Sequence, residues 1–516
     1  MAQPNRSGLN LMERYDDSGA VATAPWSDPS LARPARYVLA SGLDIVADER
    51  GGILLCLRPL LALRLNRQAT VLLEALRQPR SLNELAIHAG MTPTAIAAFL
   101  DKLACRRLVI RHPAEMTACP RVSIILPAHG RAEATRRCVQ SLLALDYPAD
   151  RREIIVVDDA SEPPLAAALR DLPVEIVRQD RNIGQSAARN LAAALASGTV
   201  LAFIDNDCVA EPDWLRGLLP YLDEPTVAMV GGRVAAPPAR GAVAAFEAVR
   251  SPLDMGAVAT EVTPTAAVSY LPTCNLLVRR DVLLAHGGFD ATLRVGEDVD
   301  FIWRTLRGGQ RAWYIPAGRV VHEHRVRWGD WLRRRADYGS SEADLQQRYP
   351  EGRRVMHLPR VSLLWLLTVT LTLTPWFGLW GLGPAALAIV LFGAELLEKQ
   401  RELRRIGVTL STGRVSVALG REHAAAFYHL SANAARYYSL PLLVIGGLQP
   451  QWLPAILLLL VVAPLADHRR LQPQISPPVF VGLYGLELAA YQIGLWRGCW
   501  QRRTLRPLLP RLIWRR

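Results

Sequence analysis

Short apolar runs rich in β-branched residues alternate with helix-like segments between residues 120 and 325. The runs are RVSIILPA, EIIVVDDA, PVEIVRQD and TVLAFIDND, and a helical stretch separates each from the next. This rhythm predicts an α/β domain with a mostly parallel sheet, because parallel strands need crossover helices and are apolar on both faces. Ligands of such sheets bind beyond the carboxyl ends of the strands.

Acidic residues stand where two of these runs end. Asp158 and Asp159 close the second run, and Asp205 and Asp207 close the fourth. Two carboxylates one residue apart suit Mg²⁺ or Mn²⁺, because these hard cations prefer oxygen ligands. An isolated Asp-x-Asp is a common pattern, so the prediction of a metal site depends on further groups nearby.

Those further groups are Glu297, Asp298 and His322. Glu297 and Asp298 open a predicted helix, where the helix dipole favours carboxylates. Acidic and imidazole groups near the ends of strands and helices in one α/β segment indicate a functional site. A single histidine is also often structural, and that alternative stays open for His322.

The length and composition of the chain limit the number and kind of its domains. The 516 residues exceed what one core accommodates, and 50% are hydrophobic, which predicts two or three domains with a membrane-associated portion. Seven dispersed cysteines without C-x-x-C spacing fit a reducing cytosol. We expect no signal peptide, and we expect residues 1–35, which contain four prolines, to be a disordered leader.

Residues 36–112 have the pattern of a small winged-helix-like module. Strand-like runs flank Gly51-Gly52, which we expect to form a turn, and three helical stretches and a closing VIRH strand follow. Ser81 with Glu84 predicts a capping box, and Thr92 before a proline predicts the start of the third helix. That helix is nearly neutral, which argues against a nucleic-acid partner.

The last third of the chain carries long apolar blocks at 362–397 and 439–466, with a weaker one at 479–496. About 20 apolar residues are needed to cross a bilayer, and glycines and prolines interrupt the first two blocks. Arginines flank every block, which favours hairpins or re-entrant segments at the inner (cytoplasmic) membrane with the flanks in the cytoplasm. A very apolar soluble helical domain is the open alternative.

The motifs VSIILPAHGR, IIVVDDAS, RNIGQSAARN, FIDND, GGFD and GEDVDFIWR, taken in order, resemble the inverting family 2 glycosyltransferases of the GT-A fold. The resemblance covers about residues 120–325. It implies that a nucleotide-diphospho-sugar gives its sugar to an acceptor hydroxyl with help from Mg²⁺ or Mn²⁺. It also implies Asp298 as the general base, with Glu297 beside it.

The resemblance places the nucleotide-sugar site at Pro127, Ala128, Asp158, Asp159, Asn182, Gly184, Arg189 and Asp205. It places the metal at Asp205, Asp207 and His322, with His324 as the other candidate. We expect Cys274 and Asn275 to line the acceptor pocket, although a plain loop fits equally well. Three structural alternatives remain open: the aspartate pair as a turn cap, Arg189 in a salt bridge with that pair, and a structural histidine.

The whole layout resembles the glycosyltransferases of the mycofactocin system. Residues 36–112 resemble a PqqD-like peptide-recognition module, which binds a leader peptide by strand addition. A catalytic domain at 120–340 and apolar helices at 355–516 complete the expected organisation. The resemblance implies UDP-glucose as donor and a peptide-derived redox cofactor, (pre)mycofactocin, or its precursor peptide as acceptor partner, with a β-linked oligoglucoside as product.

Two other functions stay open. One is a membrane family 2 enzyme of polysaccharide or lipid-linked glycan synthesis. The other is a peptide-binding scaffold with an inactive transferase domain, against which the complete acidic set argues.

Overall fold

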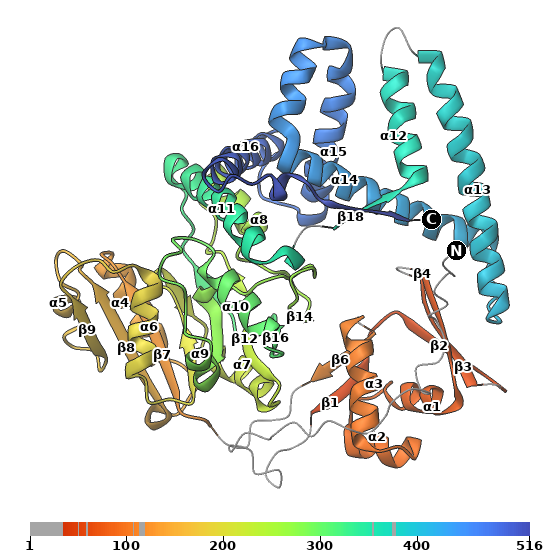
Figure 1. The fold of residues 1–516 in the computed structure, drawn as a ribbon. Coiled ribbons are helices and arrows are strands. Elements are labelled where there is room, and N and C mark those ends of the chain that lie inside the picture. The colour runs from red at the N-terminus through yellow and green to blue at the C-terminus, as the bar shows by residue number, and fades with distance from the viewer. Residues whose placement is uncertain are drawn as a thin grey trace. The chain divides into compact units, whose positions relative to one another are not determined.

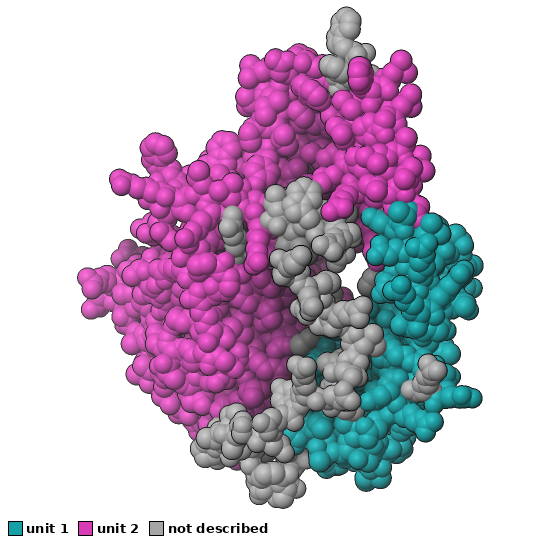
Figure 2. Space-filling model, turned by 45° about the vertical axis from the view of Figure 1, so that its right-hand side comes forward, with its two compact units in different colours: residues 1–117, 394–420 teal, residues 118–393, 421–516 magenta. Residues whose placement is uncertain are grey.

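The computed structural model describes residues 35–49, 51–57, 60–106, 108–112, 119–352, 355–373 and 378–515. Nearly all of the expected N-terminal leader therefore lies outside the described residues. Two compact units are present, one formed by residues 1–117 and 394–420 and the other by residues 118–393 and 421–516 (Figure 2).

In its described residues, the N-terminal part of the first unit contains two small sheets and three helices. One sheet has the order β2-β3-β4, and the other has the order β5-β1-β6. The strands are β1 (Arg36–Leu39), β2 (Leu43–Asp48), β3 (Gly51–Leu57), β4 (Leu60–Leu65), β5 (Arg80–Ser81) and β6 (Val109–His112). The helices are α1 (Arg67–Ala75), α2 (Leu82–Ala89) and α3 (Pro93–Cys105), and their buried leucines form the core of the unit.

The predicted helix starts are confirmed, and the predicted turn is not. Ser81 and Glu84 form the capping box of α2, and the Thr92 side chain caps α3. Gly51 and Gly52, however, lie inside β3 rather than in a turn. They are needed there because α1 passes close by: a Cβ on Gly52 would lie 2.8 Å from Oγ1 of Thr70.

The second unit is built on an eight-stranded sheet of order β14-β16-β12-β15-β10-β7-β8-β9 (Figure 1). The strands are β7 (Val122–Ala128), β8 (Arg152–Asp159), β9 (Glu175–Gln179), β10 (Val200–Phe203), β12 (Val227–Gly231), β14 (Thr260–Glu261), β15 (Leu276–Arg279) and β16 (Arg311–Tyr314). Strands β10, β7, β8 and β9 are parallel, whereas β15 and β14 run antiparallel to their neighbours. The expected mostly parallel α/β sheet is confirmed.

Helices connect the strands of the main sheet, and a small three-stranded sheet follows the end of β10. The helices of this part are α4 (Ala132–Leu143), α6 (Gln185–Leu195), α8 (Ala242–Arg250) and α10 (Glu297–Arg307). The small sheet consists of β11 (Cys208–Ala210), β17 (Val320–His322) and β13 (Val234–Ala235). Strand β11 follows the Asp-x-Asp motif directly, and its pairing sets Cys208 opposite His322. The small sheet therefore brings residues more than a hundred positions apart next to the end of β10.

Long helices dominate the remainder of the chain. They are α11 (Trp328–Arg348), α12 (Arg360–Leu373), α13 (Leu382–Arg405), α14 (Thr412–Leu448), α15 (Leu453–Leu471) and α16 (Pro477–Gln501). Each of the first two apolar blocks of the sequence forms parts of two successive helices. Within the described residues, three segments are long and apolar enough to cross a membrane, namely Leu379–Arg405, Pro450–Leu471 and Pro477–Gln501. Their length and composition support membrane association.

Helix α16 packs tightly on α11 through glycines. A Cβ on Gly494 would collide with the backbone carbonyl of Ala336, and one on Gly498 would collide with that of Ser340. In return, Gly339 of α11 contacts the Tyr491 carbonyl. Without side chains at these positions the backbones of α11 and α16 approach closely, which joins these two helices tightly.

Candidate active site

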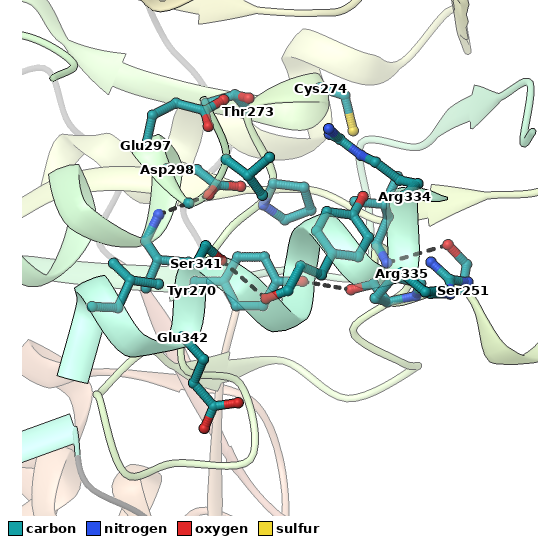
Figure 3. A pocket seen from close by; sticks show the side chains of 18 of the residues that line it. Ser251, Tyr270, Thr273, Cys274, Glu297, Asp298, Arg334, Arg335, Ser341 and Glu342 are labelled. Atoms are coloured by element: carbon teal, nitrogen blue, oxygen red, sulfur yellow. Dashed lines mark hydrogen bonds between the residues drawn. The ribbon is translucent and has the colours of Figure 1, made fainter. Parts of the chain in front are cut away.

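A cavity of about 1000 Å³ lies beyond the carboxyl ends of β7, β8 and β10 (Figure 3). Pro127 and Ala128 of β7 and Asp159 of β8 line one side of it. Residues of α11, α14 and α16 also line it. All of the lining residues belong to the second unit.

The two neighbouring aspartates of β8 have different surroundings. Asp159 lines the cavity, and its carboxylate accepts hydrogen bonds from the backbone N–H groups of Ile183 and Gly184 at 2.7 and 2.9 Å. It thereby fixes the loop that begins α6. Asn182 and Gly184 of that loop also line the cavity.

Asp158 points away from the cavity and is fully buried. Its carboxylate accepts hydrogen bonds from the N–H groups of Ser161 and Leu165 and from the Arg178 guanidinium, the last at 2.6 Å. Burial alone would raise the pKa of Asp158, but these hydrogen bonds outweigh it and lower the pKa. The structure thus gives Asp158 the role of a turn cap, not of a residue that faces a nucleotide.

Arg189 lines the cavity and connects three elements there. Its side chain is 1% exposed, and it donates to Asp205 Oδ1 at 2.7 Å and to Glu297 Oε1 at 2.9 Å. Gln185 donates to the same Glu297 oxygen at 2.6 Å. Arg189 is therefore held by Asp205 and Glu297, not by the aspartate pair of β8, and Glu297 is occupied with structural contacts.

Asp207 lies at the centre of a group of potential metal ligands. Its carboxylate is 3.4 Å from His322 Nε2, and ligand atoms of Asp207, Cys208 and His322 lie within 4.8 Å of one another. Burial raises the pKa of the Cys208 thiol, so sulfur is the least suited of the three ligands for a hard cation. Among the described residues, buried Nδ1 of His322 has no hydrogen-bond partner. Oxygen and imidazole donors at this point fit a divalent cation such as Mg²⁺ or Mn²⁺.

His324 lies farther from Asp207 than His322 does in this arrangement. Its ring stacks on that of His322 with centroids 5.0 Å apart, and its Nδ1 is 4.0 Å from Glu247. Burial lowers the pKa of His324 to about 3, so the imidazole is neutral. The side chain nevertheless borders the cavity.

Asp298 and Glu297 of α10 both line the cavity, but of these two Arg189 holds only Glu297. Asp298 Oδ1 accepts a hydrogen bond from the Val299 N–H at 2.8 Å, and no ion pair engages Asp298 within the described residues. Burial, aided by the adjacent negative Glu297, raises the pKa of Asp298 to about 7. A carboxylate with such a pKa can accept a proton near neutral pH.

Of the two residues expected on the acceptor side, only one lines the cavity. Cys274 lines the cavity. Asn275 does not: its side chain is fully buried and donates to the carbonyl groups of Arg233 and Gly318, and it accepts from the indole N–H of Trp214. Asn275 therefore ties the small sheet to the main one.

Several residues that line the cavity were not predicted from the sequence. Arg131, with φ of 53°, donates to Asp207 Oδ2 at 2.7 Å. Further lining residues are Tyr270, Arg334, Tyr338, Glu342, Arg436, Tyr437 and Tyr491. The Arg-rich stretch after His324 and the Arg-Tyr-Tyr sequence before the second apolar block were signals, but both also fit a membrane flank.

Comparisons with known proteins agree with this architecture. Residues 123–283 match the glycosyl transferase family 2 model. A pre-mycofactocin glycosyltransferase of Mycobacterium tuberculosis is 31% identical over 405 residues, which cover 76% of this chain and 82% of the relative. The glycosyltransferase AglE of Haloferax volcanii is 29% identical over 48% of this chain and 80% of the relative.

A solved structure of a mannosyltransferase from Pyrobaculum calidifontis, in complex with GDP-Man and Mn²⁺, matches 68% of this chain and 88% of its own. It is 20% identical, and the TM-score is 0.35. The family model matches the central strands, and the similarity to the M. tuberculosis relative extends over most of both chains. The chain therefore belongs to the family 2 glycosyltransferases.

Proposed function

We propose that the protein transfers a sugar from a nucleotide-diphospho-sugar to a hydroxyl of pre-mycofactocin or a closely related peptide-derived acceptor. UDP-glucose is the donor that we propose, and a β-linked oligoglucoside is the product. The similarity to the M. tuberculosis relative supports the acceptor. One observation carries the reaction type: Asp298, which has no ion pair among the described residues and a pKa raised to about 7, shares a cavity with Asp205, Asp207 and His322.

The donor occupies the strand-end side of the cavity in this proposal. Pro127, Ala128, Asp159, Asn182 and Gly184 border the space for the nucleotide. Asp205, Asp207 and His322 would hold Mg²⁺ or Mn²⁺, which supplies Lewis-acid neutralisation of the charge on a leaving diphosphate.

Asp298 acts as the general base of a single displacement. Its carboxylate takes the proton from the acceptor hydroxyl as the hydroxyl oxygen forms a bond to the anomeric carbon. The bond from that carbon to the diphosphate oxygen breaks on the opposite face, and its electron pair leaves with the diphosphate. The configuration inverts, so an α-linked donor gives a β-glycoside without a covalent enzyme intermediate. Arg189 keeps Glu297 and Asp205 in place during the step.

The first unit supplies a peptide site in this proposal. In the described part of the β2-β3-β4 sheet, β2 and β4 are the outer strands, and their edges are available for strand addition by a precursor peptide. The three apolar segments hold the protein at the inner membrane, and the flanking arginines favour a catalytic domain on the cytoplasmic side.

A lipid-linked or polysaccharide acceptor is the second candidate, and the exposed apolar side chains of Leu379, Trp380 and Leu382 favour it. The experiment is to incubate the detergent-solubilised protein with Mg²⁺ or Mn²⁺ and a panel of nucleotide sugars. Pre-mycofactocin or a lipid extract serves as acceptor, and mass spectrometry identifies the products. Hexose addition to pre-mycofactocin from UDP-glucose is expected, whereas transfer only to lipid would support the second candidate. A lack of transfer to either acceptor would contradict both.

A further inference from the structure

The cavity continues beyond Asp298 to a wall that the C-terminal helices provide. Glu342 of α11, Arg436 and Tyr437 of α14 and Tyr491 of α16 line this wall. Figure 3 shows Glu342 on the same cavity as Asp298 and Tyr270. We call these four residues the helical wall. No residue of it belongs to the strand-end motifs that define the family.

Glu342 organises the aromatic part of the helical wall. Its carboxylate accepts hydrogen bonds from the hydroxyl groups of Tyr437, at 3.1 Å, and of Tyr491. The two rings meet edge to face, with centroids 6.2 Å apart. Two helices are thereby fixed to α11, and their tyrosine rings hold defined positions at the cavity.

Arg436 is the unusual member of the helical wall. Its guanidinium carbon lies 4.2 Å from the centroid of the Tyr491 ring and 5.7 Å from that of Tyr437. Among the described residues no carboxylate lies within ion-pair distance of it. Arg335 and Arg250, which border the same cavity, are by contrast paired with Glu247, Glu487 and Asp467.

A guanidinium stacked on an aromatic face keeps its N–H edge free for another partner. That edge matches a carboxylate or carbonyl oxygen, to which it donates hydrogen bonds of fixed geometry. An arginine that lines a cavity, with no carboxylate within ion-pair distance among the described residues, can accept such an oxygen from a ligand. Arg436 exposes part of its surface and lines the cavity, so such a ligand can reach it.

Tyr270 connects the helical wall to the base. Its hydroxyl donates to the Pro252 carbonyl at 2.8 Å. Burial and the negative charge of Asp298 raise the pKa of Tyr270, and the positive charge of Arg436 opposes them. Tyr270, Asp298 and Arg436 all line the same cavity.

We propose that Arg436, held against Tyr491, binds a carboxylate or carbonyl oxygen on a ring-shaped acceptor and thereby directs the acceptor hydroxyl toward Asp298. The tyrosine rings of the helical wall contact the ring of the acceptor. Arg436 is then a specificity-determining residue that the C-terminal helices contribute. The inference rests on the proposed function for the reaction, and it adds the chemistry by which the acceptor is recognised.

The test compares two small probes that differ at one end. 4-Hydroxybenzoate carries a ring and a carboxylate, and 4-methylphenol lacks the carboxylate. Ligand-observed NMR on the full-length protein in detergent gives the Kd of each probe. We expect wild type to bind 4-hydroxybenzoate at least tenfold more tightly, because a charge-assisted bidentate contact contributes about 1.5–3 kcal/mol. Arg436→Met is expected to abolish this preference and Arg436→Lys to keep part of it.

Two comparisons make the result specific. Arg421→Met changes the same residue type on an exposed position of α14 and is expected to leave both Kd values unchanged. The Kd for UDP is expected to be the same in all variants, and the melting temperature of each variant verifies folding. Should Arg436→Met not fold, Tyr491→Leu removes the stacking partner and is expected to weaken 4-hydroxybenzoate binding about three- to tenfold.

Two outcomes overturn the inference: equal preference for 4-hydroxybenzoate in wild type and Arg436→Met, or a weakened Kd for UDP in a folded Arg436→Met protein. The second would assign Arg436 to the donor. A failure of the proposed function is distinguished by a separate assay of nucleotide-sugar consumption. If the proposed function is wrong, wild type consumes no nucleotide sugar, whichever probe binds at the helical wall.

Discussion

Glu297 and Asp298 are consecutive residues with opposite surroundings at the start of α10. Glu297 accepts hydrogen bonds from Arg189 and Gln185. Asp298 faces the cavity without an ion pair among the described residues, and its pKa is raised to about 7. Glu297 thus has a structural role and Asp298 can accept a proton. Substitutions test these two roles separately.

Replacing Asp298 by Asn is expected to lower kcat by about 10²–10⁴-fold, which is the usual contribution of a general base. The amide keeps the shape of the side chain, so the Kd for UDP is expected to stay within about twofold. Steady-state transfer rates and calorimetric titration with UDP measure both quantities. A wild-type rate in Asp298→Asn would remove Asp298 from the reaction.

The pH dependence follows from the same carboxylate. The base works only when deprotonated, so kcat/KM is expected to fall tenfold per pH unit as the pH drops below about 7. Above that value the rate is expected to level off. Any residual activity of Asp298→Asn should lack this transition, and a plateau extending down to pH 5 in wild type would contradict the assignment.

Arg189 is expected to contribute to stability rather than to direct ligand contact. Arg189→Met leaves Asp205 and Glu297 without their cation, and loss of one partner of a buried pair costs about 3–5 kcal/mol. Arg216→Met is the matched control, because its pair with Asp146 is exposed and contributes about 0–1 kcal/mol. Chemical unfolding monitored by tryptophan fluorescence compares the two. Equal effects would refute the structural role.

Asp207 is expected to dominate metal binding. Asp207→Asn should weaken Mn²⁺ binding at least tenfold, because the amide oxygen carries no charge to attract the cation. Electron paramagnetic resonance of free Mn²⁺ measures the affinity without reference to activity. Asp213→Asn, on an exposed carboxylate, serves as the control. Unchanged Mn²⁺ affinity in Asp207→Asn would mean that the ion binds elsewhere.

The contact between α11 and α16 is expected to tolerate no side chain at Gly494. Gly494→Ala brings a Cβ into the Ala336 carbonyl and should lower the melting temperature in detergent. Gly485→Ala in the same helix has nothing within 4 Å of its added Cβ. It should be neutral or stabilise by up to about 1 kcal/mol through helix propensity. The reverse order of melting temperatures would contradict the observed packing.

Features that depend on neighbouring residues were predictable from the sequence. Apolar β-branched runs identified the central strands, and the caps at Ser81 and Thr92 fixed two helix starts, because a cap needs only the next three residues. The position of the Asp-x-Asp motif at the end of β10 followed from the same pattern.

Features that depend on distant segments were not predictable. Successive residues of a strand face opposite sides, but only the loops at Ser161 and Ile183 decide that Asp158 is enclosed and Asp159 faces the cavity. Arg436 and Tyr491 reach the cavity because α14 and α16 pack on α11. Their apolar surroundings in the sequence indicated a membrane flank equally well.

The central claim is that Asp298 drives a single inverting displacement at a donor held by the strand-end acids. The most direct measurement is ¹H NMR of the glycoside formed from UDP-glucose and pre-mycofactocin, in which the coupling constant of the anomeric proton reports the configuration. The account predicts a β-glucoside. An α-glucoside would show retention and would contradict it.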